Sequence, residues 1–137
     1  MSAVPARTYF EDTGVGETNE TPALTLTEAH VALYEGLAAE PRTGGGGVPD
    51  LLPLCLVTGL GWRIPRPPLA VLSFLSVEWE IARPLRVGDT IRAATRTVAR
   101  RTMRDGGVVV EDYRVIDQRG EVAQRGRFTF LVARRPA

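Results

Sequence analysis

The run from Val48 to Trp62, VPDLLPLCLVTGLGW, is the longest apolar stretch of the chain and constrains its fold more than any other segment. Its composition predicts a helix that is buried on most sides, with Asp50 capping its start and Gly59 and Gly61 marking its end. A helix that crosses a bilayer needs about 20 apolar residues, so this run is too short to span a membrane. The rest of the chain is therefore expected to wrap around it.

Length and composition predict one soluble globular domain covering residues 1–137, which is long enough to bury its own core. The sequence is 44% hydrophobic and 24% charged, with a formal net charge of +1. Because nucleic-acid binding usually needs a strong basic excess, nucleic acid is not expected as the main partner. All 17 basic residues are Arg, which excludes mechanisms that use a lysine as a base or Schiff base.

Cys55 is the only cysteine and lies inside the apolar run. A single cysteine excludes an internal disulfide and a cysteine-based zinc site, and its apolar neighbours predict a buried structural thiol. We expect no metal and no cofactor. The N-terminus shows no charged segment followed by an apolar one, so a cytoplasmic location is predicted.

A second helix is predicted before the apolar run. Thr25 followed three residues later by Glu28 matches a capping box, and the helix is expected to continue to about Ala39. Its predicted apolar face consists of Leu26, Ala29, Leu33, Gly36 and Leu37. The four glycines that follow at 44–47 predict a flexible connector, because a phosphate-binding loop would need a lysine and a hydroxyl residue after them.

Alternating apolar and polar residues predict strands in the second half of the chain. These segments span residues 71–81, 90–102, 108–117 and 121–134, and all four are expected to be joined by short turns that contain a glycine, at residues 87–89, 104–107 and 118–120. This arrangement predicts an antiparallel meander. Arg92, Arg96 and Arg100 are expected on one face of the second of these strands.

Several motifs, spread over almost the whole chain, carry a family resemblance. They are Tyr9–Asp12, Leu26–Ala29, Leu51–Leu60, Trp79, Pro84–Ile91 and Asp117–Val122. In this order and spacing they resemble the MaoC-like hydratases and dehydratases. The resemblance implies an α+β hotdog fold, in which a curved antiparallel sheet wraps around a long central helix. It also implies dimers that act on acyl thioesters of coenzyme A or acyl carrier protein.

The stretch that carries the family's chemistry is changed in this chain. The resemblance implies an Asp and a His that act as an acid–base pair on water and the α-proton, and a backbone N–H at the central helix that polarises the thioester carbonyl. Where the family has Gly-Asp-x-Asn-Pro-x-His, this chain has Ala39-Glu40-Pro41-Arg42-Thr43 and no histidine. Pro49 and Asp50 replace a His-Gly pair. Glu40 and Asp50 therefore remain as candidate catalytic residues.

The candidate substrate-binding residues lie on the apolar run and are Leu51, Leu52, Gly59 and Trp62. Each polar candidate also has a structural explanation: a solvated helix end for Glu40, helix capping for Asp50, and a surface or partly buried structural position for His30. Glu78 and Glu80 fit a polar strand face better than an active site. The basic stripe of Arg92, Arg96 and Arg100 is either a solvated strand face or, as the resemblance implies, a contact for the phosphates of a thioester carrier.

Three functions remain open from the sequence. The chain is a hydratase or dehydratase with an altered catalytic set, a non-catalytic hotdog subunit of a heteromeric dehydratase, or a repurposed member such as a cyclase that binds a hydrophobic small molecule. The expected partners are a small hydrophobic or acyl-thioester ligand and a second hotdog chain, identical or different. No nucleic acid and no membrane is expected.

Overall fold

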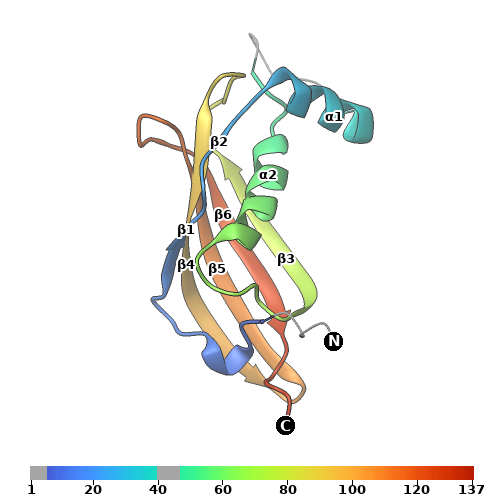
Figure 1. The fold of residues 1–137 in the computed structure, drawn as a ribbon, viewed down its shortest axis with the longest axis vertical. Helices are drawn as coiled ribbons and strands as arrows, with labels where there is room; N and C mark the ends of the chain where they lie inside the picture. Colours follow the sequence, from blue (N-terminus) through green and yellow to red (C-terminus); the bar gives the residue numbers. More distant parts are fainter. Residues whose placement is uncertain (1–5, 40–46) are drawn as a thin grey trace.

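The computed structural model describes residues 6–39 and 47–137 and shows a curved antiparallel sheet with a short helix across one face (Figure 1). The helical elements are η1 (Phe10–Asp12), α1 (Glu28–Ala38), α2 (Leu52–Leu60) and η2 (Gly61–Arg63). The strands are β1 (Thr18–Glu20), β2 (Leu24–Thr25), β3 (Val71–Ile81), β4 (Thr90–Met103), β5 (Gly106–Ile116) and β6 (Val122–Val132). Within the described residues, no helix is long and apolar enough to cross a membrane.

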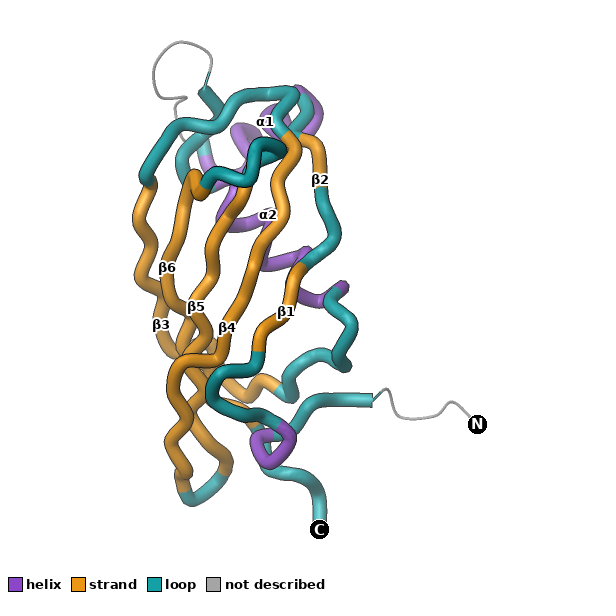
Figure 2. Tube along the Cα trace, turned by 90° about the vertical axis from the view of Figure 1, so that its left-hand side faces the viewer, coloured by secondary structure: helices purple, strands orange, loops and turns teal. Residues whose placement is uncertain are grey.

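The strand order is β1-β4-β5-β6-β3, with β2 also paired to β4 (Figure 2). Strands β4, β5 and β6 form the predicted meander, but β3 pairs with β6 rather than with β4. The meander prediction is therefore wrong for β3. Its link to β4, residues 82–89, contains Pro84 and is longer than a hairpin loop of 2–5 residues. It leads past β6 and β5 to β4, which lies next to β1 near the other edge of the sheet.

Helix α2 buries one side only. Its buried side chains are Leu52, Pro53, Val57 and Leu60. With 3.6 residues per turn, Leu51, Cys55 and Thr58 fall on the opposite side, and all three are exposed. The predictions of a helix buried on most sides and of a buried thiol at Cys55 are thus wrong for the single chain. The predicted end of the helix is correct, because α2 stops at Leu60 with Gly61 as its C-cap.

Helix α1 begins two residues later than predicted. Thr27 is the N-cap, its Oγ1 accepts a hydrogen bond from the backbone N–H of His30, and His30 Nδ1 accepts one from the N–H of Thr27. Thr25 instead lies in β2 opposite Thr90, so the predicted Thr25–Glu28 capping box is wrong. This reciprocal contact explains the single histidine of the sequence as a capping residue.

The predicted apolar face of α1 is correct only for Leu26, which is buried in the core but precedes the helix. Leu33 is 70% exposed and Leu37 is 89% exposed, whereas Val31 is the buried residue of the helix. Because the helix begins at Glu28 and lies beside the end of the sheet, only the face with Val31 meets the core.

Hydrophobic side chains form two clusters on the inner face of the described sheet. The larger one, between α2 and the sheet, includes Val57, Tyr113 and Phe128. The smaller one lies towards the chain termini and consists of Phe10, Leu69, Val109 and Val132. Alternation along β5 places Val109 in the small cluster and Tyr113 in the large one, so Glu111 lies between them.

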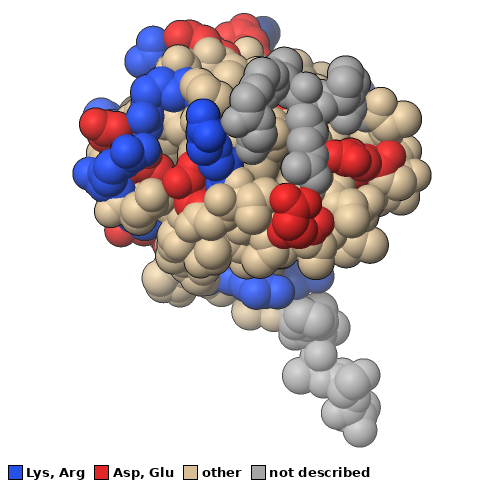
Figure 3. All heavy atoms as spheres, turned by 90° about the horizontal axis from the view of Figure 1, so that it is seen from above, with Lys and Arg blue, Asp and Glu red and all other residues tan. Residues whose placement is uncertain are grey.

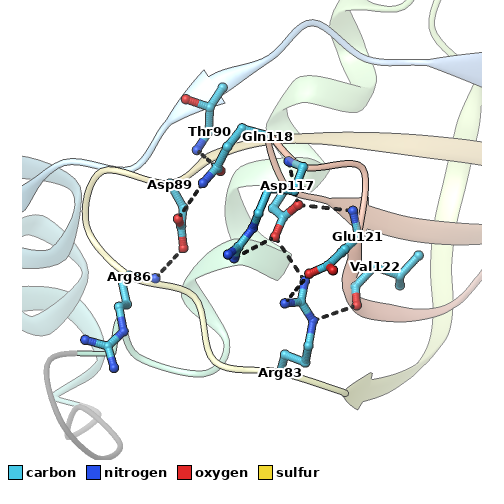
Figure 4. A network of polar contacts seen from close by, with 9 residues as sticks. Arg83, Arg86, Asp89, Thr90, Asp117, Gln118, Glu121 and Val122 are labelled. Atoms are coloured by element: carbon cyan, nitrogen blue, oxygen red, sulfur yellow. Dashed lines mark hydrogen bonds and ion pairs between the residues drawn. The ribbon is translucent and has the colours of Figure 1, made fainter.

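Two of the motifs that carry the family resemblance form a polar network at the α1 end of the molecule (Figure 4). Asp117 is buried, and its oxygens accept hydrogen bonds from the N–H groups of Arg119 and Glu121 and from the guanidinium of Arg83. Although burial raises the pKa of the Asp117 carboxyl, these hydrogen bonds outweigh it and hold the pKa well below its ordinary value. Acidic and basic side chains lie next to one another at this end of the surface (Figure 3).

Gln118 connects the two turns of this network. Its side chain donates to Asp89 Oδ1 at 3.0 Å and accepts from the N–H of Thr90, while Asp89 Oδ2 accepts from the N–H of Arg86. The network therefore fastens the turn before β4 to the turn between β5 and β6. These motif residues hold the sheet's turns together.

The predicted arginine stripe on β4 is interrupted. A register shift between Thr97 and Ala99 adds a residue to β4, and beyond it Arg100 pairs with the inward-facing Val109. The guanidinium of Arg100 stacks 4.1 Å from the Phe10 ring centroid and donates to Phe10 O. Arg100 therefore does not share a face with Arg92 and Arg96, and the prediction of one stripe is wrong.

Candidate functional site

The start of α2 is where the family resemblance places the carbonyl-polarising N–H. The N-cap is Leu51, whose side chain makes no capping hydrogen bond, so the prediction that Asp50 is the N-cap residue is wrong. The N–H of Leu52 donates to Pro49 O at 3.1 Å, and Pro53 has no N–H. These features leave few backbone donors for a carbonyl oxygen at this end of the helix.

The predicted site residues have different surroundings. Glu40 lies outside the described residues, and Asp50 is half-buried with its backbone carbonyl bonded to the Gln124 side chain at 2.9 Å. Leu52 belongs to the core, while Leu51 is 42% exposed. The structure brings neither leucine into the pocket described next.

A small apolar pocket lies at the other end of α2. Its volume is about 220 Å³, and it opens between the α2–η2 region, the connector to β3 and the inner face of the sheet. Five aromatic side chains line it: Trp62, Phe74, Tyr113, Phe128 and Phe130. Of the predicted ligand-binding residues, Trp62 therefore lines this pocket, whereas Gly59 is exposed beside it and faces open space.

An ion pair forms the polar part of this pocket. Arg66 Nη2 lies 3.4 Å and 3.5 Å from the two carboxylate oxygens of Glu111, and Arg66 Nη1 lies 3.8 Å from Glu17 Oε2. The side chain of Glu111 is 3% exposed and that of Arg66 is 14% exposed. Burial raises the pKa of the Glu111 carboxyl, and the nearby Arg66 opposes this shift only in part.

The hydrogen-bonding capacity of this ion pair is not fully used. Arg66 Nε and Nη1 are buried and donate to no acceptor within residues 6–39 and 47–137. Glu17 Oε2 and Thr97 Oγ1 are likewise buried without a hydrogen-bond partner in these residues, and Thr97 is the cross-strand neighbour of Glu111. A buried charge pair with spare donors contributes little to stability, since apolar residues of similar volume often stabilise a fold better. These groups are therefore candidates for a functional role.

Tyr113 lies between the ion pair and the aromatic wall. Its hydroxyl would be 3.0 Å from a Cβ placed on Gly61, so the absence of a side chain at Gly61 lets the end of α2 approach the tyrosine. Burial first, and then the Glu111 carboxylate, raise the pKa of the Tyr113 hydroxyl above its ordinary value. Tyr113 is thus a neutral phenol that lines the pocket near the carboxyl group.

Glu111 was not among the predicted site residues, although the sequence carries a signal for it. In residues 108–117, every second residue faces inward, and Glu111 lies on the same face as Val109, Tyr113 and Val115. A carboxylate at a core position of a strand is rare unless it is paired. Arg66, in a proline-rich connector 45 residues earlier, could not be identified as the partner from such a pattern.

A larger hollow of about 690 Å³ lies on the face of the sheet opposite α2. It is open and lined by charged side chains that pair across strands, such as Arg127 with Asp112 and Arg125 with Glu80. Paired and exposed charges are typical of a solvated sheet face. We therefore assign the candidate site to the smaller apolar pocket.

Comparisons with known proteins agree with this architecture. No protein-family model matches the chain, and no curated protein matches it either. Among solved structures, the monoamine oxidase regulatory protein from Archaeoglobus fulgidus is similar, with 25% identity and a TM-score of 0.86 over 95% of this chain and 97% of that one. A MaoC-like dehydratase from Rhodospirillum rubrum is 22% identical, with a TM-score of 0.79 over 94% and 99% of the two chains.

Two further similar structures extend this set. An R-hydratase from Pseudomonas aeruginosa is 13% identical, with a TM-score of 0.78 over 94% of this chain and 88% of that one. The 3R-hydroxyacyl-ACP dehydratase complex from Mycobacterium tuberculosis contains a chain that is 12% identical, with a TM-score of 0.69 over 85% of this chain and 96% of that one.

The curved antiparallel sheet, the helix across its inner face and these similarities define the chain as a hotdog-fold protein. Its structural neighbours are MaoC-like dehydratases and R-hydratases, which confirms the resemblance and the fold predicted from the sequence.

Proposed function

We propose that this chain is a MaoC-like hotdog protein that binds an acyl thioester of coenzyme A or acyl carrier protein, with the acyl part in the pocket at the end of α2. The observation that carries the proposal is the apolar, aromatic-lined pocket of about 220 Å³. At about 30 Å³ per water molecule, this volume equals about seven waters and fits a short chain or a single ring. A complete thioester with its carrier is too large, so the carrier would remain outside.

The acid–base chemistry of this protein differs from that of the hydratases it resembles. Its sequence lacks their Asp and His stretch, and the start of α2 offers few free N–H groups. Glu111, with its raised pKa and its position in the pocket, is a better candidate for a general acid or base than Asp50. The proposed activity is therefore hydratase-like or dehydratase-like with an altered catalytic set.

A second hotdog chain is the proposed protein partner. In the described sheet β3 is an edge strand, and its exposed apolar side chains are Leu72, Phe74, Leu75, Val77 and Ile81. A long apolar edge is prone to pair with another strand. The dehydratase complex from Mycobacterium tuberculosis supports a heteromer as the alternative to a homodimer, with this chain as a non-catalytic subunit.

The proposal is tested by measuring binding and turnover of 2-enoyl-coenzyme A thioesters of increasing chain length. We expect short chains to bind, longer chains to be rejected, and Glu111→Gln to lower turnover by about 10²-fold or more without loss of binding. Asp50→Asn is the matched variant at the predicted catalytic residue and should retain turnover.

Two outcomes contradict this proposal. If no thioester of any chain length binds the purified protein, its assignment as a thioester-binding protein is wrong. If thioesters bind but turnover is absent, and the chain forms a stable complex with a different hotdog chain, the non-catalytic subunit is the better description. Light scattering of the purified protein distinguishes a homodimer from a monomer.

A further inference from the structure

The pocket combines an apolar wall with a polar group that an ordinary acyl chain does not need. Phe74, Phe128 and Phe130 contact one another with ring centroids 5.1–6.1 Å apart and form the apolar side. Arg66 and Glu111 line the same pocket from the connector and from β5. An unsubstituted acyl chain would leave both groups without an additional partner and would gain nothing from their burial.

The spare donors determine which ligand atom fits. Arg66 uses Nη2 for Glu111, whereas Nε and Nη1 are buried and donate to no acceptor in the described part of the chain. Glu17 Oε2, which faces Nη1, is likewise buried and accepts no hydrogen bond there. A guanidinium has no acceptor, so the atom it binds must be an acceptor such as an oxygen. The 3.8 Å separation between Arg66 Nη1 and Glu17 Oε2 is an ion pair but is too long for a hydrogen bond.

The charges of the cluster argue against an anionic ligand. One guanidinium, on Arg66, faces two carboxyl groups, on Glu17 and Glu111, so the cluster has no positive charge left to neutralise an anion. Placing a further negative charge in this largely buried region would cost desolvation without compensation. An uncharged oxygen avoids this cost and still accepts from the guanidinium.

We propose that Arg66 and Glu111 form a polar subsite that binds an uncharged carbonyl or hydroxyl oxygen on a small aromatic or cyclic group inside the pocket. Arg66 donates to this oxygen, and Glu111 holds the guanidinium in place and can exchange a hydrogen bond with a hydroxyl. The ligand is thus an oxygen-bearing ring of about the size of one aromatic group. This inference rests on the proposed function only in that the same pocket holds the ligand.

Three matched probes test the subsite: acetophenone, which carries a carbonyl, ethylbenzene, which has the same carbon skeleton without the oxygen, and benzoate, which is anionic. Affinities are measured by NMR titration of the purified 137-residue protein. In a purely apolar pocket ethylbenzene would bind more tightly, because its transfer from water is more favourable. We expect the reverse, with acetophenone binding about fivefold to tenfold more tightly than ethylbenzene and benzoate binding most weakly.

Variants identify the groups responsible. The double variant Arg66→Met/Glu111→Leu replaces the pair by apolar residues and is expected to fold, since such replacements are often neutral or stabilising. It should lose the preference for acetophenone and bind ethylbenzene at least as tightly as the unchanged protein does. Arg63→Met is the matched control, because Arg63 is exposed in η2 and does not line the pocket.

Each contrary result overturns the inference. Equal or tighter binding of ethylbenzene rejects the polar subsite, tighter binding of benzoate rejects an uncharged ligand oxygen, and absence of binding by all three probes rejects the pocket as a site. The probes contain no thioester, so a preference for acetophenone together with failure of the thioester experiment would contradict the proposed function and support the subsite.

Discussion

The indole nitrogen of Trp79 donates a 2.8 Å hydrogen bond to Gln124 Oε1 and thereby joins the side chains of two neighbouring strands, β3 and β6. The other end of the same amide, Gln124 Nε2, donates to Asp50 O at the start of α2. Gln124 is 1% exposed, so one buried amide on β6 connects the edge strand β3 to the start of α2. Trp79, one of the residues that carry the family resemblance, thus helps to hold the fold together. It does so by bonding to Gln124, which lies outside the motifs of the resemblance.

Replacing Gln124 by Leu should lower the free energy of unfolding by about 2 kcal/mol, because the Trp79 N–H and the Asp50 carbonyl both lose their buried partner. Urea unfolding followed by tryptophan fluorescence measures the change. Gln118→Leu is the control: it also removes two side-chain hydrogen bonds, but at an exposed position, and should cost less than about 1 kcal/mol. Equal costs for the two variants would contradict the importance of burial.

Replacement by alanine should have opposite effects on stability at two glycines, Gly126 and Gly36. A Cβ on Gly126 would overlap Glu78 O and the Trp79 ring, so Gly126→Ala should destabilise the protein by about 3 kcal/mol. A Cβ on Gly36, within α1, would meet nothing within 4 Å, so Gly36→Ala should be neutral or stabilising by up to about 1 kcal/mol. Thermal unfolding of both variants checks the contrast, and destabilisation by Gly36→Ala would show that α1 packs differently.

The start of α1 allows a direct comparison between Thr25, the N-cap predicted from the sequence, and Thr27, the N-cap in the structure. Thr27→Ala should speed amide exchange in the first turn of α1 and cost about 1 kcal/mol of local stability, because the N–H of His30 loses its acceptor. Thr25→Ala removes only the contact between the hydroxyls of Thr25 and Thr90 and should leave exchange in α1 unchanged. Faster exchange in Thr25→Ala alone would restore the cap predicted from the sequence.

The strands were the most predictable part of this fold, because the alternation of apolar and polar side chains along a strand can be recognised in a single sequence over about ten residues. The position of β3 beside β6 was not predictable in that way, since alternation determines which face a residue occupies and not which strand lies next to it. The bulge that turns Arg100 inward depends on a single extra residue in β4. Neither Thr97 nor Ala99 is a glycine or another residue type that would mark a bulge in the sequence.

The candidate site was less predictable than the fold. Trp62 was selected from its place on the apolar run and does line the pocket, but Arg66 and Glu111 become neighbours only when the connector after α2 folds onto β5. The family resemblance pointed to Glu40 and Asp50, near the other end of α2 in the sequence. Partner assignment for a buried charge needs tertiary structure, whereas the unusual inward position of Glu111 was already present in the sequence.

The buried carboxyl of Glu111 makes a specific contribution to the pH dependence of stability. Burial raises its pKa in the folded state above the ordinary value of 4.5, so between these two values the folded protein binds more protons than the unfolded chain. The free energy of unfolding then falls as the pH rises through this interval, and the Glu111 contribution is constant above it. Glu111→Gln keeps the size of the side chain and removes this titration.

The stability of Glu111→Gln relative to the unchanged protein should therefore increase as the pH rises through the interval above 4.5 and then level off. Urea unfolding of both proteins at a series of pH values gives this difference, in which the opposite contribution of Asp117, whose pKa is lowered, cancels. Glu80→Gln, which removes an exposed carboxylate paired with Arg125 at 3.3 Å, is the control. A difference that stays constant with pH, or that Glu80→Gln reproduces, would show that Glu111 titrates as an ordinary surface carboxylate and is no candidate for acid–base chemistry.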